Sequence, residues 1–173
     1  MKETLQDLKT RRSCRKYKQE QIKDEELNAI LEAGTYAPTG IGAQSPIILA
    51  VQDKETRDLL SKLNADVLGS EADPFYGAPT VLVILADRNR KTYIDDGNMV
   101  IANLLNAAHA VGVDSCYIYR AREMFDSKKG KELLKKWGVS DNYEGIGNCI
   151  LGYGLPEGIK EAAPRKEGYV IRV

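Results

Sequence analysis

The apolar residues of the chain follow two patterns that alternate along its length. Where they recur every three or four residues, they indicate one face of an amphipathic helix. This pattern predicts a helix with Leu5 and Leu8 that ends near Thr10, a helix over 24–34, a helix that Asp53 caps and that buries Leu59, Leu60 and Leu63, a helix from Asp95 or Asp96 to about Val111, and a helix from the capping residue Asp126 to 137–138.

The second pattern is a short continuous apolar run, which indicates a strand. Such runs predict five strands, over 46–51, 80–86, 115–119, 146–153 and 169–173. The run over 81–85 does not alternate with polar residues, so we expect helices to cover both faces of the sheet. Strands that alternate with helices favour a helix–sheet–helix sandwich, and a chain of 173 residues suits a single domain over 1–173.

The predicted helix that ends near Val111 is apolar on almost every side, which is typical of a central buried helix. From Met99 onward, this helix has more apolar surface than one domain of this size readily covers, and this predicts a homodimer. Asn103, Asn106 and His109 form a polar line at a spacing of three. His109 is the only histidine, and we interpret it as a packed residue rather than an acid or base.

Charge and composition narrow the possible functions. The 25 basic and 25 acidic residues give a net charge of zero, whereas proteins that bind nucleic acid or membrane surfaces usually have a basic excess. The chain starts with polar residues and its longest aliphatic run, 81–86, is too short to cross a bilayer, so we expect a cytoplasmic protein. Cys14, Cys116 and Cys149 lie far apart, which favours free thiols over a zinc site or disulfides.

Known catalytic and phosphate-binding motifs are absent. The sequence has no glycine-rich dinucleotide or P-loop motif and no Gly-x-Ser-x-Gly nucleophile elbow. No pair of carboxylates is placed for acid–base chemistry. We therefore predict no dedicated catalytic side chain.

Several segments have compositions that suit a ligand. Residues 11–18 carry five positive charges, and arginine forks with a serine hydroxyl suit a phosphate or a ring carbonyl. Residues 37–46 are small enough for a ligand to approach the backbone, and the Gln44 amide suits the edge of a heterocycle. The glycines of 142–153 and the basic pair before 169–173 are weaker signals. Taken singly, the segment over 37–46 is equally typical of a plain turn, and the other three are more typical of surface turns and loops.

The order of the motifs is more specific than any one of them. The chain contains Arg-Arg-Ser-x-Arg-x-Tyr at 11–17, Ala-Pro-Thr at 37–39, Gln-x-Pro at 44–46, Ala-Pro-x-Val-Leu-Val at 78–83, Asp-x-Gly at 95–97, Asn-Leu-Leu-x-Ala-Ala at 103–108, Leu-Gly-Tyr at 151–153 and Arg-Lys at 165–166. In this order, and over nearly the whole chain, they resemble the FMN-dependent nitroreductase family.

The resemblance implies an α+β fold, a three-layer α-β-α sandwich with a mixed central sheet, and FMN bound without a covalent bond at a homodimer interface. It implies that the flavin is contacted by Arg11, Arg12, Ser13 and Arg15, and that Arg165 or Lys166 completes the phosphate site. The other subunit would contribute Pro38, Thr39, Gly40 and Gln44. The resemblance also implies that Gly145 and Ile146 present backbone near the ring nitrogen N5 and that Asn64 contacts the ring edge.

One departure from the family pattern is Gly42, which stands where the family often has asparagine. The chain is also short at 90–93 and at 119–126, where longer relatives carry insertions that shape the substrate pocket. The physiological electron acceptor is therefore not fixed by the sequence.

The resemblance implies an oxidoreductase in which NADH or NADPH reduces FMN and a small acceptor, such as a nitroaromatic or a quinone, then reoxidises it by a ping-pong hydride mechanism. Two alternatives remain open. A flavin-binding carrier or sensor without efficient turnover would share every binding motif. A basic anion-binding module without flavin would be colourless.

Overall fold

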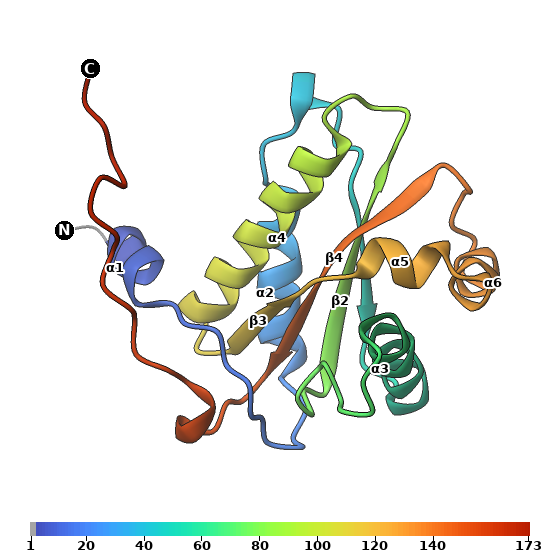
Figure 1. The fold of residues 1–173 in the computed structure, drawn as a ribbon, viewed down its shortest axis with the longest axis horizontal. Coiled ribbons are helices and arrows are strands. Elements are labelled where there is room, and N and C mark those ends of the chain that lie inside the picture. Colours follow the sequence, from blue (N-terminus) through green and yellow to red (C-terminus); the bar gives the residue numbers. More distant parts are fainter. Residues whose placement is uncertain (1–2) are drawn as a thin grey trace.

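A computed structural model describes residues 3–173, so the first two residues of the predicted domain, 1–173, lie outside it. The described chain has an α+β fold in which helices pack on a four-stranded sheet (Figure 1). Its elements are α1 (Glu3–Thr10), α2 (Asp24–Thr35), the short 3-10 turn η1 (Gly40–Gly42), β1 (Ile47–Val51), α3 (Lys54–Leu68), β2 (Thr80–Asp87), α4 (Tyr93–Ala110), β3 (Asp114–Ile118), α5 (Ala121–Asp126), α6 (Lys128–Lys136), β4 (Tyr143–Gly152) and the 3-10 turn η2 (Pro156–Gly158).

The sheet has the strand order β1-β2-β4-β3, and each pair of neighbouring strands is antiparallel. The predicted mixed sheet is therefore wrong for these four strands. An alternation of strands and helices does not fix strand direction, because a long connection can return the chain to either end of the sheet. The described chain has one isolated parallel bridge, between Ser13 and Ser115, outside the named strand pairs.

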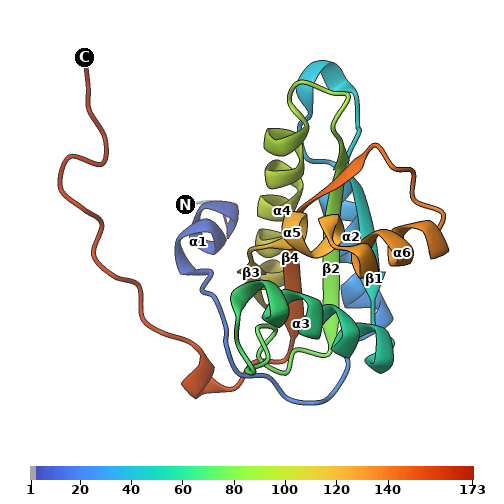
Figure 2. The same ribbon diagram turned by 45° about the vertical axis from the view of Figure 1, so that its right-hand side comes forward.

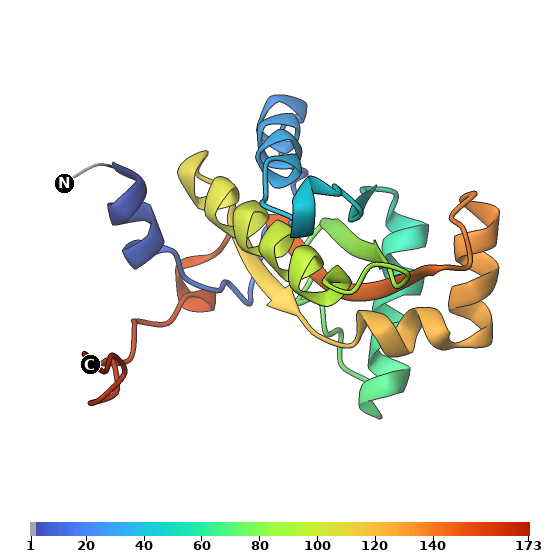
Figure 3. The same cartoon turned by 90° about the horizontal axis from the view of Figure 1, so that it is seen from above.

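β2 is buried on both faces, as its unbroken apolar run predicts. Val81, Val83 and Leu85 face one core, which α3, α5 and α6 cover, and Leu82 and Ile84 face another, which α2 and α4 cover. Figure 3 shows these helices on opposite sides of the sheet. Burial of each such side chain contributes roughly 1.5–3 kcal/mol, so this strand anchors both cores.

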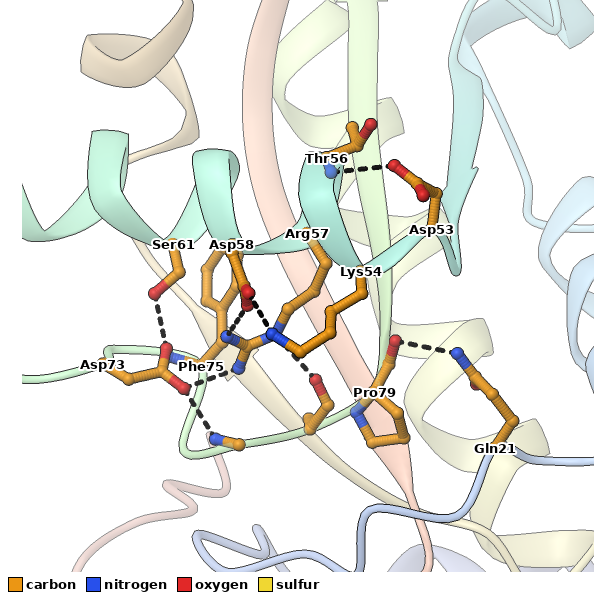
Figure 4. Close-up of polar contacts among 12 residues, drawn as sticks. Gln21, Asp53, Lys54, Thr56, Arg57, Asp58, Ser61, Asp73, Phe75 and Pro79 are labelled. Carbon is orange, nitrogen blue, oxygen red and sulfur yellow. Dashed lines mark hydrogen bonds and ion pairs between the residues drawn. The ribbon is translucent and has the colours of Figure 1, made fainter.

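The start of α3 is stabilised by the residue that the sequence predicts. The Thr56 backbone N–H donates to Oδ2 of Asp53 over 2.8 Å, which confirms Asp53 as the cap (Figure 4). One turn further on, the buried Arg57 donates from Nε to the Ala78 carbonyl over 2.9 Å and from Nη2 to Oδ2 of Asp73 over 2.6 Å. These bonds fix the segment between α3 and β2.

Asp73 is the acceptor at the centre of this network (Figure 4). Its carboxylate also accepts from the Ser61 hydroxyl and from the backbone N–H groups of Phe75 and Gly77. Burial alone would raise the pKa of Asp73, but these hydrogen bonds and the Arg57 bond outweigh it and lower the pKa below its ordinary value. The network is structural, because donors from the chain occupy both carboxylate oxygens.

Two predicted helix starts are wrong. α4 begins at Tyr93 rather than at Asp95 or Asp96, which instead lie in its first turn, where the helix dipole also favours negative charge. Asp126 ends α5, a six-residue helix that the periodicity did not predict, so it cannot cap the next helix. Ser127 caps α6 instead and accepts from the Gly130 N–H over 3.0 Å.

The predicted strand over 169–173 is not formed. The segment that follows η2 leaves the body of the molecule (Figure 2), and Tyr169, Val170, Ile171 and Val173 are exposed. Its residues favour strands, but a strand needs a neighbour, and within residues 3–173 this segment has none. Among the described helices, none is both long and apolar enough to cross a bilayer.

Candidate functional site

The basic segment after α1 is held in a fixed place between β3 and the C-terminal part of the chain. Ser13 forms its parallel bridge with Ser115, and the Cys14 N–H donates to the Ser115 carbonyl over 3.0 Å. On the other side, the Arg15 N–H donates to the Gly158 carbonyl over 2.9 Å. Backbone hydrogen bonds therefore place this arm, residues 11–15, beside the segment that follows β4.

A cleft of about 700 Å³ opens where these two segments meet. Its lining residues are Leu8, Lys9, Arg11, Arg12, Ser13 and Arg15 from the N-terminal part and Lys160, Glu161, Ala162, Ala163 and Arg165 from the C-terminal part. We call it the basic cleft. Lys166 is not among its lining residues, and its ammonium lies 5.7 Å from the centre of the Tyr169 ring.

The two arginines at the end of α1 have different surroundings. Arg12 donates from Nη1 to the carbonyl oxygens of Lys9, at 2.8 Å, and of Arg11, at 2.6 Å. Nη1 of Arg11 is buried and, among the described residues, has no hydrogen-bond partner. A buried donor without an acceptor is unfavourable, which makes Arg11 a candidate to bind an anion in the basic cleft.

The loop over 37–44 has an unusual backbone. Ile41, Gly42 and Gln44 adopt left-handed conformations, with φ of 52°, 67° and 48°. Ile41 is 97% exposed, although it is apolar and β-branched. A side chain added at Gly42 would meet no atom within 4 Å, so the position where the family often has asparagine borders open space. Strained and exposed backbone of this kind is common at ligand sites.

α1, whose end borders the basic cleft, and the loop over 37–44 lie at opposite ends of α4 (Figure 1). The Gly40 N–H donates to Oδ1 of Asp96 in the first turn of α4, whereas Thr10 Oγ1 lies 2.8 Å from Nε2 of His109 in the last turn. Thirteen residues of helix span roughly 20 Å. Within one chain, therefore, the structure does not bring the two parts of the predicted site together. His109 packs α1 against α4.

Asn64 is fully buried, and both ends of its amide are engaged. Nδ2 donates to the Tyr119 carbonyl over 2.8 Å, and Oδ1 accepts from Nε of Arg120 over 3.0 Å. In this arrangement Asn64 has no accessible polar atom for a ring edge, and it orients Arg120 instead.

Gly145 and Ile146 lie inside the fold rather than in the basic cleft. A side chain at Gly145 would overlap the Ala121 carbonyl, so this glycine allows β4 to pack beneath the start of α5. Ile146 packs against Gly97 of α4, where an added Cβ would lie 2.6 Å from the isoleucine Cγ1. Both residues have a packing role in the single chain.

The junction between β3 and α5 is a feature that the motifs did not reveal. The consecutive carbonyls of Ile118 and Tyr119 accept from two buried amides, those of Asn148 at 3.3 Å and Asn64 at 2.8 Å. Arg120 then adopts φ of 78°. Buried amides that fix a strained turn at the end of a strand are typical of a functional position, and Asn148 inside an apolar run was the available signal.

Comparison with known proteins places this arrangement in a family. The model of the Nitroreductase family matches residues 8–154. The chain belongs to the nitroreductase family. A solved nitroreductase with bound FMN from Bacteroides fragilis is 27% identical, and the two chains cover each other completely with a TM-score of 0.91.

Two relatives by sequence extend the comparison. A protein of Archaeoglobus fulgidus, provisionally named an NADH dehydrogenase/NAD(P)H nitroreductase, is 30% identical over 88% of this chain and 86% of its own. The FMN reductase [NAD(P)H] of Bacillus subtilis is 32% identical over 66% of this chain and 46% of its own. The likeness to the Bacteroides structure includes both ends of the nitroreductase chain, which form the basic cleft.

Proposed function

We propose that the chain is a homodimeric, FMN-dependent oxidoreductase that uses NADH or NADPH to reduce small acceptors such as quinones and nitroaromatics. The observation that carries the proposal is the basic cleft, in which a buried guanidinium N–H of Arg11 has no acceptor among the described residues. The relatives support the same chemistry, because one binds FMN and another is named an FMN reductase that uses NAD(P)H.

The basic cleft has the donor set that a flavin phosphate requires. Arg11 and Arg15 offer guanidinium groups, Ser13 offers a hydroxyl, and Arg165 approaches from the other end of the chain. Lys166 follows directly and can join the site if the exposed C-terminal segment turns inward. Hydrogen bonds between such cations and an anion contribute roughly 1.5–3 kcal/mol each.

The second subunit supplies what one chain cannot. Pro38, Thr39, Gly40 and Gln44 lie roughly 20 Å from the basic cleft of their own chain along α4, so they can complete only a partner's site. α4 buries one face, with Val100 and Leu104, and leaves Met99 exposed. We place the dimer contact on this side of the α-β-α layers, with the apolar C-terminal segment packed on the partner.

FMN held in this site would supply the transfer of a hydride from the reduced nicotinamide and of electrons to the acceptor. The protein's own residues bind the cofactor and exclude water. Arg15, further along the arm than Arg11, is placed to stabilise negative charge at the edge of the ring, and the Tyr119–Arg120 junction lies at the end of the neighbouring strand β3. Gly145 packs beneath the start of α5, next to this junction, whereas Ile146 packs against Gly97 of α4.

The decisive experiment is the absorption spectrum of the freshly purified protein, followed by mixing with NADH and NADPH under nitrogen. We expect a yellow dimer by light scattering, one that releases FMN on denaturation and is bleached by at least one nicotinamide. A quinone or nitroaromatic should then restore the colour. Flavin that neither nicotinamide bleaches favours a carrier or sensor, and a colourless protein that rejects added FMN favours an anion-binding module.

A further inference from the structure

Asp96 is a buried carboxylate that no step of the proposed chemistry uses. It is 4% exposed and lies in the first turn of α4. Its Oδ1 accepts from the Gly40 N–H over 2.8 Å, and its Oδ2 accepts from the Thr92 hydroxyl over 3.0 Å. One side chain therefore joins the loop that carries Gly40 to the start of the helix.

The backbone fits this connection closely. A side chain at Gly40 would overlap the Thr92 hydroxyl and lie 3.1 Å from Thr92 Cβ, so only glycine lets the loop lie flush against the turn before α4. We refer to Gly40, Thr92 and Asp96 as the loop clamp. Beyond it, Ile41 and Gln44 hold left-handed conformations. Such backbone persists only where the surroundings determine it. Here the Gln44 N–H donates to Thr39 Oγ1 over 3.0 Å within the loop, and the clamp attaches the loop to α4.

We propose that Asp96 positions the loop over 39–44 for the flavin ring of the partner subunit, and so sets the affinity of a site that its own chain does not hold. This inference rests on the proposed function. The clamp lies roughly 20 Å along α4 from the basic cleft of the same chain. Asp96 therefore acts on the ring end of the partner's cofactor and not on the phosphate end.

The first test compares FMN with riboflavin, which lacks the phosphate. Asp96→Ala removes both acceptors, so affinity for the two flavins should fall by the same factor, about tenfold, because a hydrogen bond to a charged group contributes about that factor or more. Asp96→Asn keeps an oxygen for the Gly40 N–H and should restore most of the affinity. Asp95→Asn is the matched control, because Asp95 is exposed and removes the same charge from the same helical turn.

Titration of apo protein by flavin fluorescence reads these affinities without any turnover. If circular dichroism shows that Asp96→Ala does not fold, Gly40→Ala is the alternative, because it disturbs the same loop at the other partner of the hydrogen bond. It should also lower the affinities for FMN and riboflavin by the same factor. Affinities that match those of Asp95→Asn in both variants would overturn the inference, as would a loss confined to FMN. A parent protein that binds neither flavin would instead refute the proposed function.

The second test asks whether Asp96 acts across the interface. Dimers are formed from one subunit with Arg11→Ala and Arg15→Ala and one subunit with Asp96→Ala, each with a different tag. If the loop serves the partner, one of the two sites combines an intact cleft with an intact loop, and the mixed dimer binds one FMN with the parent's affinity. If Asp96 serves its own chain, both sites carry a defect and no tight site remains, which would contradict the inference.

Discussion

Arg11 provides a prediction in which stability and binding change in opposite directions. Its Nη1 is buried and has no hydrogen-bond partner among the described residues. Leaving a buried donor unsatisfied costs about 1–3 kcal/mol. Arg11→Met keeps an unbranched apolar stem and removes that donor. Because the rest of the Arg11 side chain is only half-buried, we expect the apo protein to gain about 1 kcal/mol, at the lower end of this range.

A gain of this size raises the melting temperature by about 2–4 °C for a domain of this length. The same substitution removes a phosphate donor, which should weaken FMN binding by about tenfold to a hundredfold. At an FMN concentration of about 100 times the parent's Kd, binding stabilises the parent by about 2.7 kcal/mol, and the variant by only about 0.4–1.4 kcal/mol. The variant should thus melt above the parent without FMN and below it with FMN.

The assay is a thermal melt at fixed protein concentration, with and without saturating FMN, and Arg12→Met is the control. Arg12 lines the same cleft, but its Nη1 donates to the carbonyls of Lys9 and Arg11. Its loss leaves those carbonyls without this donor, so the apo protein should melt lower than the parent. Arg11→Met could instead lower the melting temperature of the apo protein and leave the FMN-induced rise in melting temperature unchanged. In that case the Arg11 guanidinium does not bind the flavin phosphate.

Three further substitutions or deletions test other parts of the structure. Gly145→Ala forces a side chain into the Ala121 carbonyl and should cost about 1–3 kcal/mol in the apo protein, as measured by urea unfolding. An effect on flavin affinity alone would contradict the packing role. The folded pKa of Asp73 is lowered, so its stabilisation is present above its ordinary pKa of 3.8 and is lost as pH falls through the folded value. The difference in melting temperature between the parent and Asp73→Asn should therefore shrink below about pH 4, and a constant difference would refute this. Deletion of residues 169–173 should weaken the dimer in light scattering while the circular dichroism spectrum is kept, and an unchanged dimer would show that the segment does not pack on the partner.

Local signals in the sequence predict those elements whose cause is local. β2 was identified because five consecutive aliphatic residues are buried on two faces, and the start of α3 because Asp53 is a strong capping residue. α5 was missed because six residues are too few to show a helical period. Strand direction, and whether residues 169–173 form a strand, depend on contacts between segments that are distant in the sequence. A local pattern does not contain these contacts.

The candidate site also contains some features that the sequence predicts and others that only the fold reveals. The arm over 11–15 could be predicted because Arg-Arg-Ser-x-Arg-x-Tyr is the first of an ordered set of family motifs, and Arg11, Arg12 and Arg15 line the basic cleft. The family resemblance predicts ligand contacts at Gly145 and Asn64, and small or polar residues also serve close packing. Only the fold reveals that Gly145 lies under the Ala121 carbonyl and that Asn64 has both ends of its amide engaged.

The separation of the two predicted binding segments along α4 connects these observations. An anion-binding module that works as a monomer has no use for a strained, exposed loop roughly 20 Å from its cleft. A cofactor with a charged phosphate and a flat, largely uncharged ring needs two different surroundings, one basic and one built from backbone and amide groups. In the proposed dimer, α4 has the first at one end and the second at the other, and it joins them by packing near a second copy of itself. The exposed Met99 of α4, the unpaired donor of Arg11 among the described residues and the exposed Ile41 are all accounted for by the proposed site shared between two subunits.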